Sequence, residues 1–282
     1  MPPRGVARAS TGLALRHPAT PRTFARRIPL IVAAAFFMET LDATIITTAL
    51  PAIAKALGRS TLDLTASITV YLVAMTALVP AAGWASERFG ARTVFAAAVA
   101  TFTVASFLCG VSPTYETLIA SRLLQGAAAA FMSPVGRLIV LRESPKHEII
   151  AAIGLIVWPG LIAPVIGPPL GGFITTYASW RWIFLLNIPM GLLGVWLILH
   201  YIPAHAKSAG ARFDATGFVL TAIALASVIH GLSLIAEGRD ASLAGGVFVA
   251  AGAAAGFAAV RHVQVPRFRL YVGSARQFAQ LE

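Results

Sequence analysis

Eight long apolar stretches alternate with short polar connections along the chain. Each stretch is long enough for a helix, rising about 1.5 Å per residue, to cross a hydrocarbon core of about 30 Å. This pattern predicts an all-α polytopic membrane protein. The predicted spans are residues 29–53, 65–83, 93–111, 115–136, 149–174, 181–202, 214–236 and 243–261.

The fifth predicted span, 149–174, has no charged residue but contains nine glycines and prolines. In water such a composition would indicate a loop. A loop in the hydrocarbon region would leave backbone N–H and C=O groups unpaired, each at a cost of several kcal/mol. We therefore predict a helix that is bent by its prolines and packed closely against protein neighbours through its glycines.

Two acidic residues lie deep in the first predicted span. Glu39 and Asp42 are three residues apart and share a helix face. An acid near the bilayer centre costs about 2.5–3.5 kcal/mol, which favours a function for both. Arg122, about 9 Å inside the fourth span at the helical rise, reaches the level of Asp42. We predict that Asp42 and Arg122 pair and couple to protons, and that Glu39 takes a second proton or a cationic substrate.

Basic residues are divided unevenly between the two sides of the predicted membrane. Of 22 lysines and arginines, 17 lie in the two tails and in the second, fourth and sixth connections, and four lie on the opposite side. Because cytoplasmic loops are enriched in basic residues, this division places both ends in the cytoplasm and explains the net charge of +11 without nucleic acid. Residues 1–28, with six arginines and no acid, form either a targeting peptide or, as we prefer, a cytoplasmic tail.

Composition supports a membrane protein and argues against an enzyme. Hydrophobic residues make up 57% of the chain and charged residues 12%, and the mean hydropathy is +0.78. The single cysteine, Cys109, excludes an intrachain disulfide and a cysteine-based metal site. The histidines show no metal-ligand spacing, and the chain has no nucleophile–base set or phosphate-binding loop. We expect no catalytic residue, no metal and no cofactor.

Three motifs resemble those of the major facilitator superfamily. GWASERFGAR, after the second span, resembles the superfamily's loop motif through Gly83, Glu87, Arg88, Gly90 and Arg92, although Glu87 replaces an aspartate and Ala91 a base. The fourth span resembles the fourth-span motif through Arg122, Gln125 and Gly126. In the fifth span, APVIGPPLGG resembles the antiporter motif. The residues that we assign to the antiporter motif, including two just upstream of this stretch, are Pro159, Gly160, Gly167, Pro168, Gly171 and Gly172.

Two further stretches narrow the resemblance. Residues 41–51 resemble a first-span motif of drug:proton antiporters, and WRWIFLLNIPMG at 180–191 is common in the fourteen-span EmrB/QacA-type subfamily. Within the latter, Asn187 is either a ligand contact or, as we prefer, a packing residue. In the loop motif the glycines allow a tight turn, and Glu87 is placed to pair with a base or to cap a helix. His230 in the seventh span is expected to be packed and neutral.

The resemblance implies a domain order. Residues 29–202 form the six-span N-terminal half of a major facilitator fold, built from two three-helix repeats. A linker with two extra spans follows at 203–262. The polar, basic tail at 263–282 is either a surface-lying helix or the product of a shifted reading frame. Members of the subfamily continue into six more spans, so the chain looks truncated.

The implied function is proton-coupled efflux of small amphipathic compounds across the cytoplasmic (inner) membrane, with the proton gradient as energy source. Two alternatives stay open: a non-transporting truncated fragment or subunit that needs a second half, and an uncoupled facilitator. The expected partners are the lipid bilayer, protons, a small-molecule substrate and a missing C-terminal half or a second copy. Since substrate sites in such folds lie between two halves, we expect the chain alone not to transport and Glu87 to lack its usual contact.

Overall fold

The computed structural model describes residues 22–204, 213–237 and 239–278, and describes side chains within 26–204, 213–236 and 242–262. Across these residues the chain forms ten α-helices and no strand. The helices are α1 Arg22–Leu57, α2 Thr61–Leu78, α3 Ala81–Phe89, α4 Ala91–Val111, α5 Tyr115–Glu143, α6 Ile149–Tyr177, α7 Trp182–Leu185, α8 Asn187–Tyr201, α9 Ala215–Glu237 and α10 Arg239–Phe278. Most of the predicted tail at 1–28 and the connection at 205–212 lie outside the described residues.

Eight segments of the described chain are long and apolar enough to cross a membrane, which confirms the predicted number of spans. α7 and α8 together form the sixth of these segments, Trp182–Tyr201. The second span was expected to reach residue 83, but α2 ends at Leu78 and α3 begins at Ala81. The chain turns at Pro80, which has no N–H with which to continue the helical hydrogen bonds.

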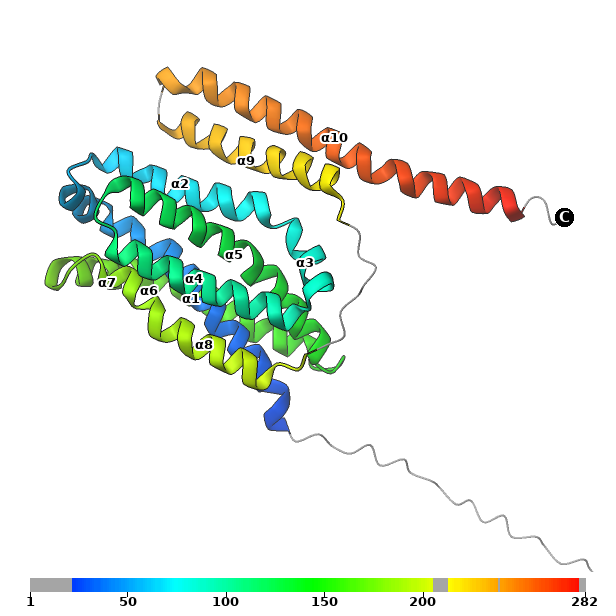
Figure 1. Ribbon diagram of the computed structural model, residues 1–282, viewed down its shortest axis with the longest axis horizontal. Helices are drawn as coiled ribbons and strands as arrows, with labels where there is room; N and C mark the ends of the chain where they lie inside the picture. The colour runs from blue at the N-terminus through cyan, green and yellow to red at the C-terminus, as the bar shows by residue number, and fades with distance from the viewer. Residues whose placement is uncertain (1–21, 205–212, 238, 279–282) are drawn as a thin grey trace, which may run out of the picture.

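The first span lies inside a bundle of six. α1 contacts α2, α5, α6, α7 and α8, whereas α4 packs against α5 and α8. Figure 1 shows these helices lying side by side along the bundle. Apolar side chains from α1, α4 and α5 fill its centre, among them Val32, Phe95, Phe102 and Met132. The polar side chains described below interrupt this core at the level of Asp42.

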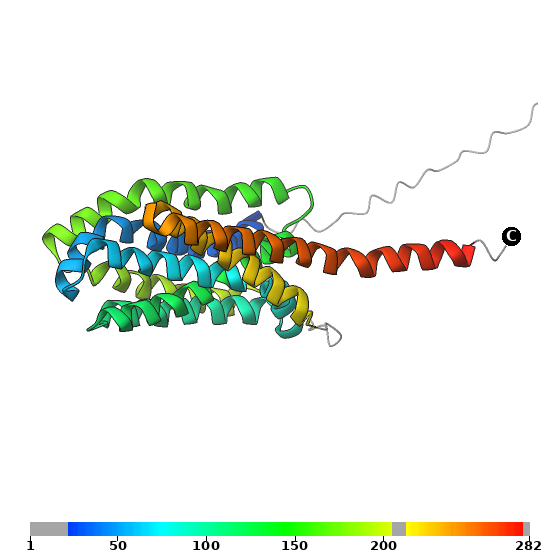
Figure 2. The same cartoon turned by 90° about the horizontal axis from the view of Figure 1, so that it is seen from above.

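The last two spans form a hairpin outside the bundle. α9 and α10 pack against each other, and α9 lies along α2 (Figures 1 and 2). Glycines permit the close approach within the hairpin, because a Cβ at Gly231 would overlap the backbone of Gly245. The hydroxyls of Thr69 in α2 and Ser233 in α9 are 3.0 Å apart, which links the hairpin to the bundle.

The predicted tail after His262 is helical as far as Phe278, where the described residues end. Residues 263–278 continue α10, which is a single helix of 40 residues. At about 1.5 Å per residue this helix is roughly 60 Å long, about twice the thickness of a hydrocarbon core. Figures 1 and 2 show it projecting straight past the end of the bundle.

The glycine- and proline-rich stretch forms one helix, α6, that runs through four internal prolines. Its buried face packs against α1 and consists of Ala152, Ile156, Ala163, Gly167, Gly171 and Ile174. A Cβ at Gly167 would overlap Thr44, and a Cβ at Gly171 would overlap Thr48. The expected close packing through glycines is therefore present on this face. The opposite face is exposed, and a Cβ at Gly172 would meet nothing within 4 Å.

Candidate functional site

Asp42 and Arg122 are in direct contact. Asp42 projects from α1 and Arg122 from the N-terminal half of α5, and Nη1 of Arg122 lies 2.6 Å from Oδ2 of Asp42. Both side chains are 0% exposed. Burying either charge alone would cost several kcal/mol, and the opposite charge at hydrogen-bond distance offsets part of that cost. The removal of one partner would leave the other buried without compensation.

Two side-chain amides complete the surroundings of Asp42. Nε2 of Gln125 and Nδ2 of Asn187 donate to Oδ1 of Asp42 at 2.9 and 2.8 Å. Both nitrogens also lie close to Oγ of Ser106, at 2.6 and 3.1 Å. We call Asp42, Ser106, Arg122, Gln125 and Asn187 the Asp42 cluster. It joins α1, α4, α5 and α8 by polar contacts in the middle of an apolar bundle.

The guanidinium of Arg122 is held from several sides. Its Nη1 also donates to Oε1 of Gln125 at 2.6 Å, and its Nε lies 3.5 Å from the carbonyl oxygen of Ser67. Cζ of Arg122 lies 4.4 Å from the ring centroid of Tyr71, which is a cation–π distance. Two buried polar atoms, Nη2 of Arg122 and the hydroxyl of Tyr71, have no hydrogen-bond partner among the described residues. The guanidinium of Arg122 is therefore held from several sides, although its Nη2 is not hydrogen-bonded.

Gly126 sets the distance between α5 and α2 at this level. A Cβ at Gly126 would overlap the carbonyl of Tyr71, so a larger residue would push the two helices apart. Arg122 and Gln125 lie within one turn of Gly126 and face Asp42. The three residues of the fourth-span motif thus act together, because two supply polar groups and the third supplies space.

Glu39 lies outside the Asp42 cluster and has a different environment. Its side chain is buried, and the hydroxyl of Ser133 in α5 lies 3.1 and 2.9 Å from its two carboxyl oxygens. A single hydroxyl has one hydrogen and serves one oxygen at a time. Arg137, one turn further along α5, is exposed and forms no ion pair with Glu39 in the described structure. Asp42 thus faces a guanidinium, whereas Glu39 faces a hydroxyl.

The loop motif is largely helical, and only one of the two glycines that were expected to allow a tight turn lies at a turn. α3 contains Gly83, Glu87 and Arg88. Of the two glycines of the motif, only Gly90 has a positive φ, of +89°, and it joins α3 to α4. Glu87 is exposed and pairs with no base in the described part of the chain. The guanidinium of Arg92 donates to the carbonyl of Leu199 near the end of α8.

Sequence reasoning missed several polar residues of these sites. Ser106, Tyr71 and Ser133 were not singled out, and Asn187 does more than pack, since it bonds Asp42. Two signals were available in the sequence. Ser106 is a polar residue within an apolar span, and Asn187 is the only asparagine of the chain. Neither signal tells which way the side chain points.

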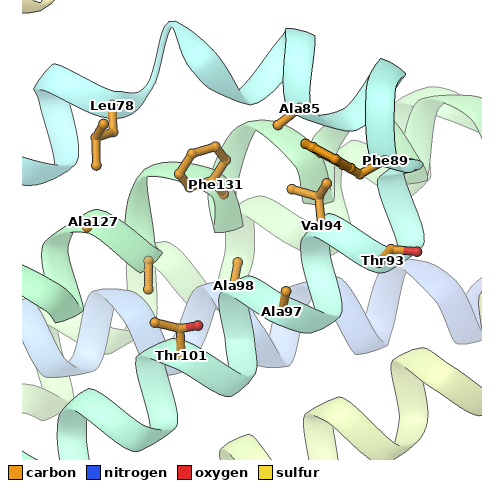
Figure 3. A pocket seen from close by; sticks show the side chains of 11 residues that line it. Leu78, Ala85, Phe89, Thr93, Val94, Ala97, Ala98, Thr101, Ala127 and Phe131 are labelled. Carbon is orange, nitrogen blue, oxygen red and sulfur yellow. The ribbon is translucent and has the colours of Figure 1, made fainter. Parts of the chain in front are cut away.

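Two apolar cavities lie away from the Asp42 cluster. The first, of about 400 Å³, lies between α2, α3, α4 and α5, and Figure 3 shows Phe131 and Phe89 facing the small side chains of α4 across it. The second, of about 340 Å³, lies between the bundle and the hairpin and is lined in part by His230. His230 is exposed and touches the ring of Phe248 edge-on at 5.0 Å, so it is less enclosed than expected.

The described residues offer no candidate metal site. They contain no group of three His, Cys, Asp or Glu side chains placed to hold an ion. Cys109 is buried, with its Sγ 3.7 Å from Oε1 of Gln125. Cys109 therefore contributes a weak hydrogen bond at the edge of the Asp42 cluster.

Comparison with known sequences points to one family. The sequence matches the Major Facilitator Superfamily over residues 32–275. The putative multidrug resistance protein MdtD of Yersinia pestis (strain Pestoides F) is 44% identical over 202 residues, which cover 72% of this chain and 43% of the relative. The protein of the same name from Yersinia pseudotuberculosis (serotype O:1b, strain IP 31758) gives the same values. The chain thus spans less than half the length of these curated relatives.

Comparison with solved structures supports the fold. A D-xylose-proton symporter superposes with a TM-score of 0.55 at 13% identity, over 86% of this chain and 69% of the symporter. The human organic anion transporter MFSD10 (TETRAN) superposes with a TM-score of 0.54 at 16% identity, over 77% of this chain and 57% of the transporter. At these identities the likeness concerns the arrangement of the helices alone.

Proposed function

The chain belongs to the Major Facilitator Superfamily, and we propose that it forms the N-terminal part of a transporter that exports small amphipathic compounds in exchange for protons. This superfamily consists of membrane transporters rather than enzymes. The 44% identity to putative multidrug resistance proteins supports drug-like compounds as the substrate class. The buried contact between Asp42 and Arg122 is the observation that carries the proton part of the proposal.

Binding of a proton at Asp42 would change the charge balance of the cluster. While Asp42 is ionised, its charge and that of Arg122 cancel. Once Asp42 accepts a proton, Arg122 remains charged, because a guanidinium does not deprotonate in proteins. A single charge inside a bilayer is costly, so the protonated cluster favours a conformation in which water or another acid reaches Arg122. A proton that biases two conformations in this way meets the requirement for coupling.

Glu39 has the second role in the proposal. It is buried on the same helix as Asp42, and the Ser133 hydroxyl is its hydrogen-bond donor. An ionised carboxylate with so few donors gains from a positively charged partner or from a proton. We assign it to a second proton or to the cationic group of a substrate.

The eight spans and the family make the chain an integral membrane protein. We place it in the cytoplasmic (inner) membrane with both termini in the cytoplasm, as the division of lysines and arginines supports. In this orientation the first span runs outward and the fourth runs inward. The contact between Asp42 and Arg122 then lies in the outer half of the membrane.

A second half completes the proposed transporter. In folds of this type the substrate site lies between two halves that rock against each other. The exposed face of α6 supports such a partner. Pro164 and Pro168 have no N–H, so the carbonyls of Gly160 and Pro164 lose their helical donors, and lipid offers no replacement. The second half is a further part of the same protein, a separate chain or a second copy. A subunit that is inactive by itself is accordingly the second candidate function.

Reconstitution separates these possibilities. The purified chain is placed in proteoliposomes, alone or with the C-terminal part of a 44% identical relative, and ethidium movement is followed with and without a proton gradient. We expect gradient-dependent flux with both parts and none with the chain alone. Robust flux by the chain alone would contradict the need for a different second half and would favour a homodimer. Flux that ignores the gradient would favour an uncoupled facilitator.

A further inference from the structure

The hydrogen bonds around Asp42 fit the ionised carboxylate only. Oδ1 receives two amide N–H groups, from Gln125 and Asn187, and Oδ2 receives the guanidinium of Arg122. All three groups donate, and an ionised carboxylate only accepts. A proton on Oδ1 would therefore point at another donor, and a proton on Oδ2 would find no acceptor among these three groups. Some group of the cluster has to change its orientation when Asp42 becomes protonated.

Gln125 is not free to make this change. Its Oε1 accepts from Nη1 of Arg122 at 2.6 Å, while its Nε2 donates to Asp42 and lies 2.6 Å from Oγ of Ser106. Reversal of this amide would place an NH₂ group against the guanidinium. The charged hydrogen bond to Arg122, among the strongest types in proteins, would be lost.

Asn187 has no such constraint. Both of its hydrogen bonds are made by Nδ2, to Asp42 at 2.8 Å and to Ser106 at 3.1 Å, and its carbonyl oxygen accepts from no residue that the structure describes. Rotation of the amide by half a turn would present this carbonyl to the same two partners. Ser106 fits either orientation, because a hydroxyl both donates and accepts.

We propose that the side-chain amide of Asn187 reverses when Asp42 takes up a proton, so that Asn187 is the positioning residue that transmits the protonation state. With Asp42 ionised, the NH₂ group donates to Asp42 and Ser106. With Asp42 protonated by a proton from water, the carbonyl accepts from the new O–H of Asp42 and from the hydroxyl of Ser106. The inference rests on the proposed role of Asp42 as the proton site.

The position of Asn187 in the chain gives the reversal a structural consequence. Asn187 is the first residue of α8 and follows Leu186, which separates α7 from α8 but keeps helical dihedral angles (φ −58°, ψ −29°). Pro189, in the first turn of α8, has no N–H, so the carbonyl of Leu185 lacks its helical donor, and fewer backbone hydrogen bonds hold this junction than hold the middle of a continuous helix. The amide therefore connects the charge state of α1 to the joint of the sixth span.

The other titratable groups around Asp42 are few. Arg122 faces it from α5, Tyr71 from α2 and Cys109 from α4, and Glu39 lies one turn away on α1. α6, α7 and α8 place no titratable side chain beside it. A pH response of Asn187 that persists in the Glu39→Gln variant is therefore attributed to the titration of Asp42.

The experiment uses the fact that Asn187 is the only asparagine of the chain. This chain of 282 residues, labelled with ¹³C and ¹⁵N asparagine, gives one side-chain amide signal in lipid bilayers. Protonation of Asp42 is followed in parallel by the infrared band of its carboxylic acid, assigned by its loss in unlabelled Asp42→Asn. As the pH is lowered, we expect the Cγ and Nδ2 signals of Asn187 to shift with the same pH midpoint as the Asp42 band. This midpoint should be unchanged in Glu39→Gln. In Ser106→Ala the shift should be smaller.

The outcomes separate this inference from the proposed function. If the Asp42 band titrates while the Asn187 signals stay constant, the reversal is wrong and Asp42 remains the proton site. If no Asp42 band appears at any pH at which the chain stays folded, the proposed proton site fails, and this inference fails with it. The matched substitution Ser133→Ala, beside Glu39, should leave the Asn187 response intact, and its loss there would also contradict the assignment.

Discussion

Arg122 is the largest of the fully buried side chains in the described structure, and its charge dominates the energetics around it. Asp42 supplies the opposite charge, and Gln125 and Tyr71 supply a carbonyl oxygen and an aromatic face. Each of these groups reduces the cost of keeping a guanidinium away from water. The effect of a substitution at this site on stability should therefore depend on which polar or charged groups it leaves unpaired, rather than on the change in side-chain size.

Tyr71 provides a residue-level test of this view. Its hydroxyl is buried and has no partner among the described residues, while its ring lies over Arg122. Tyr71→Phe keeps the ring and removes an unpaired polar group, so we expect an unchanged or slightly higher unfolding midpoint in detergent. The matched substitution Gln125→Leu removes partners of both Asp42 and Arg122 and should lower the midpoint by several degrees. An equal loss in Tyr71→Phe would mean that the hydroxyl is bonded.

Some contacts between these residues can be predicted from the sequence and others cannot. The contact of Asp42 with Arg122 follows from charge, depth and helical rise, because few opposite charges share a level in a membrane. The approach of Ser106, Tyr71 and Asn187 depends instead on how each helix is rotated about its axis. A span that is apolar on all sides gives no periodic signal for that rotation, so these contacts could not be predicted.

At the scale of elements, adjacent glycines of α6 differ sharply. A Cβ at Gly171 would overlap Thr48 and the carbonyl of Ile45 in α1, whereas a Cβ at Gly172 would meet nothing within 4 Å. We expect Gly171→Ala to destabilise the chain by about 1–3 kcal/mol through forced separation of α1 and α6. Gly172→Ala should be neutral or slightly stabilising. Unfolding by sodium dodecyl sulfate measures both, and equal effects would argue against the α1–α6 contact.

The start of α9 carries a pH-dependent cap. Oδ1 of Asp214 accepts from the backbone N–H of Gly217 at 2.9 Å, and this hydrogen bond, followed by the contact with His262, holds the pKa of Asp214 below its ordinary value. Since the folded pKa is the lower one, the stabilisation is present above the unfolded pKa of about 3.9 and is lost as pH falls through the folded pKa.

Hydrogen exchange at the Gly217 amide measures this cap. We expect protection at neutral pH that disappears in acid, and faster exchange at all pH values in Asp214→Ala. Asp214→Asn retains an acceptor oxygen but does not titrate. In this variant the protection of the Gly217 amide should therefore be nearly constant over the pH range in which Asp214 takes up a proton. Unchanged protection in Asp214→Ala would show that the cap does not hold the start of α9.

Sequence reasoning was most successful for whole spans and least for their ends. The eight spans follow from length and hydropathy, which the bilayer imposes on every crossing helix. The end of the second span was misplaced because Ala81, Ala82 and Gly83 are as apolar as the span itself, and the break depends on the single proline at position 80. The straight extension of α10 after His262 was also missed, since its polar composition carries no information on direction.

At the scale of the whole molecule, the bundle resembles one half of a major facilitator fold with a hairpin beside α2. The helices of that half converge on the Asp42 cluster, which joins four spans. A transporter needs two conformations, and a polar cluster that links several helices is well placed to favour one of them. The central claim is that Asp42 sets this preference by binding a proton.

Asp42→Asn tests the central claim most directly, in a transporter completed by a second half. Asparagine keeps the size of the side chain and an oxygen toward Arg122, but it does not bind and release a proton. We expect the variant to be expressed and to bind ethidium in membranes, at a lower unfolding midpoint because Arg122 loses its opposite charge, with gradient-driven export reduced to the level of vesicles without protein. Loss of expression and folding would instead assign Asp42 and Arg122 a purely structural role. Export at the normal rate against a gradient would contradict the account, and Glu39 would then be the acid to test.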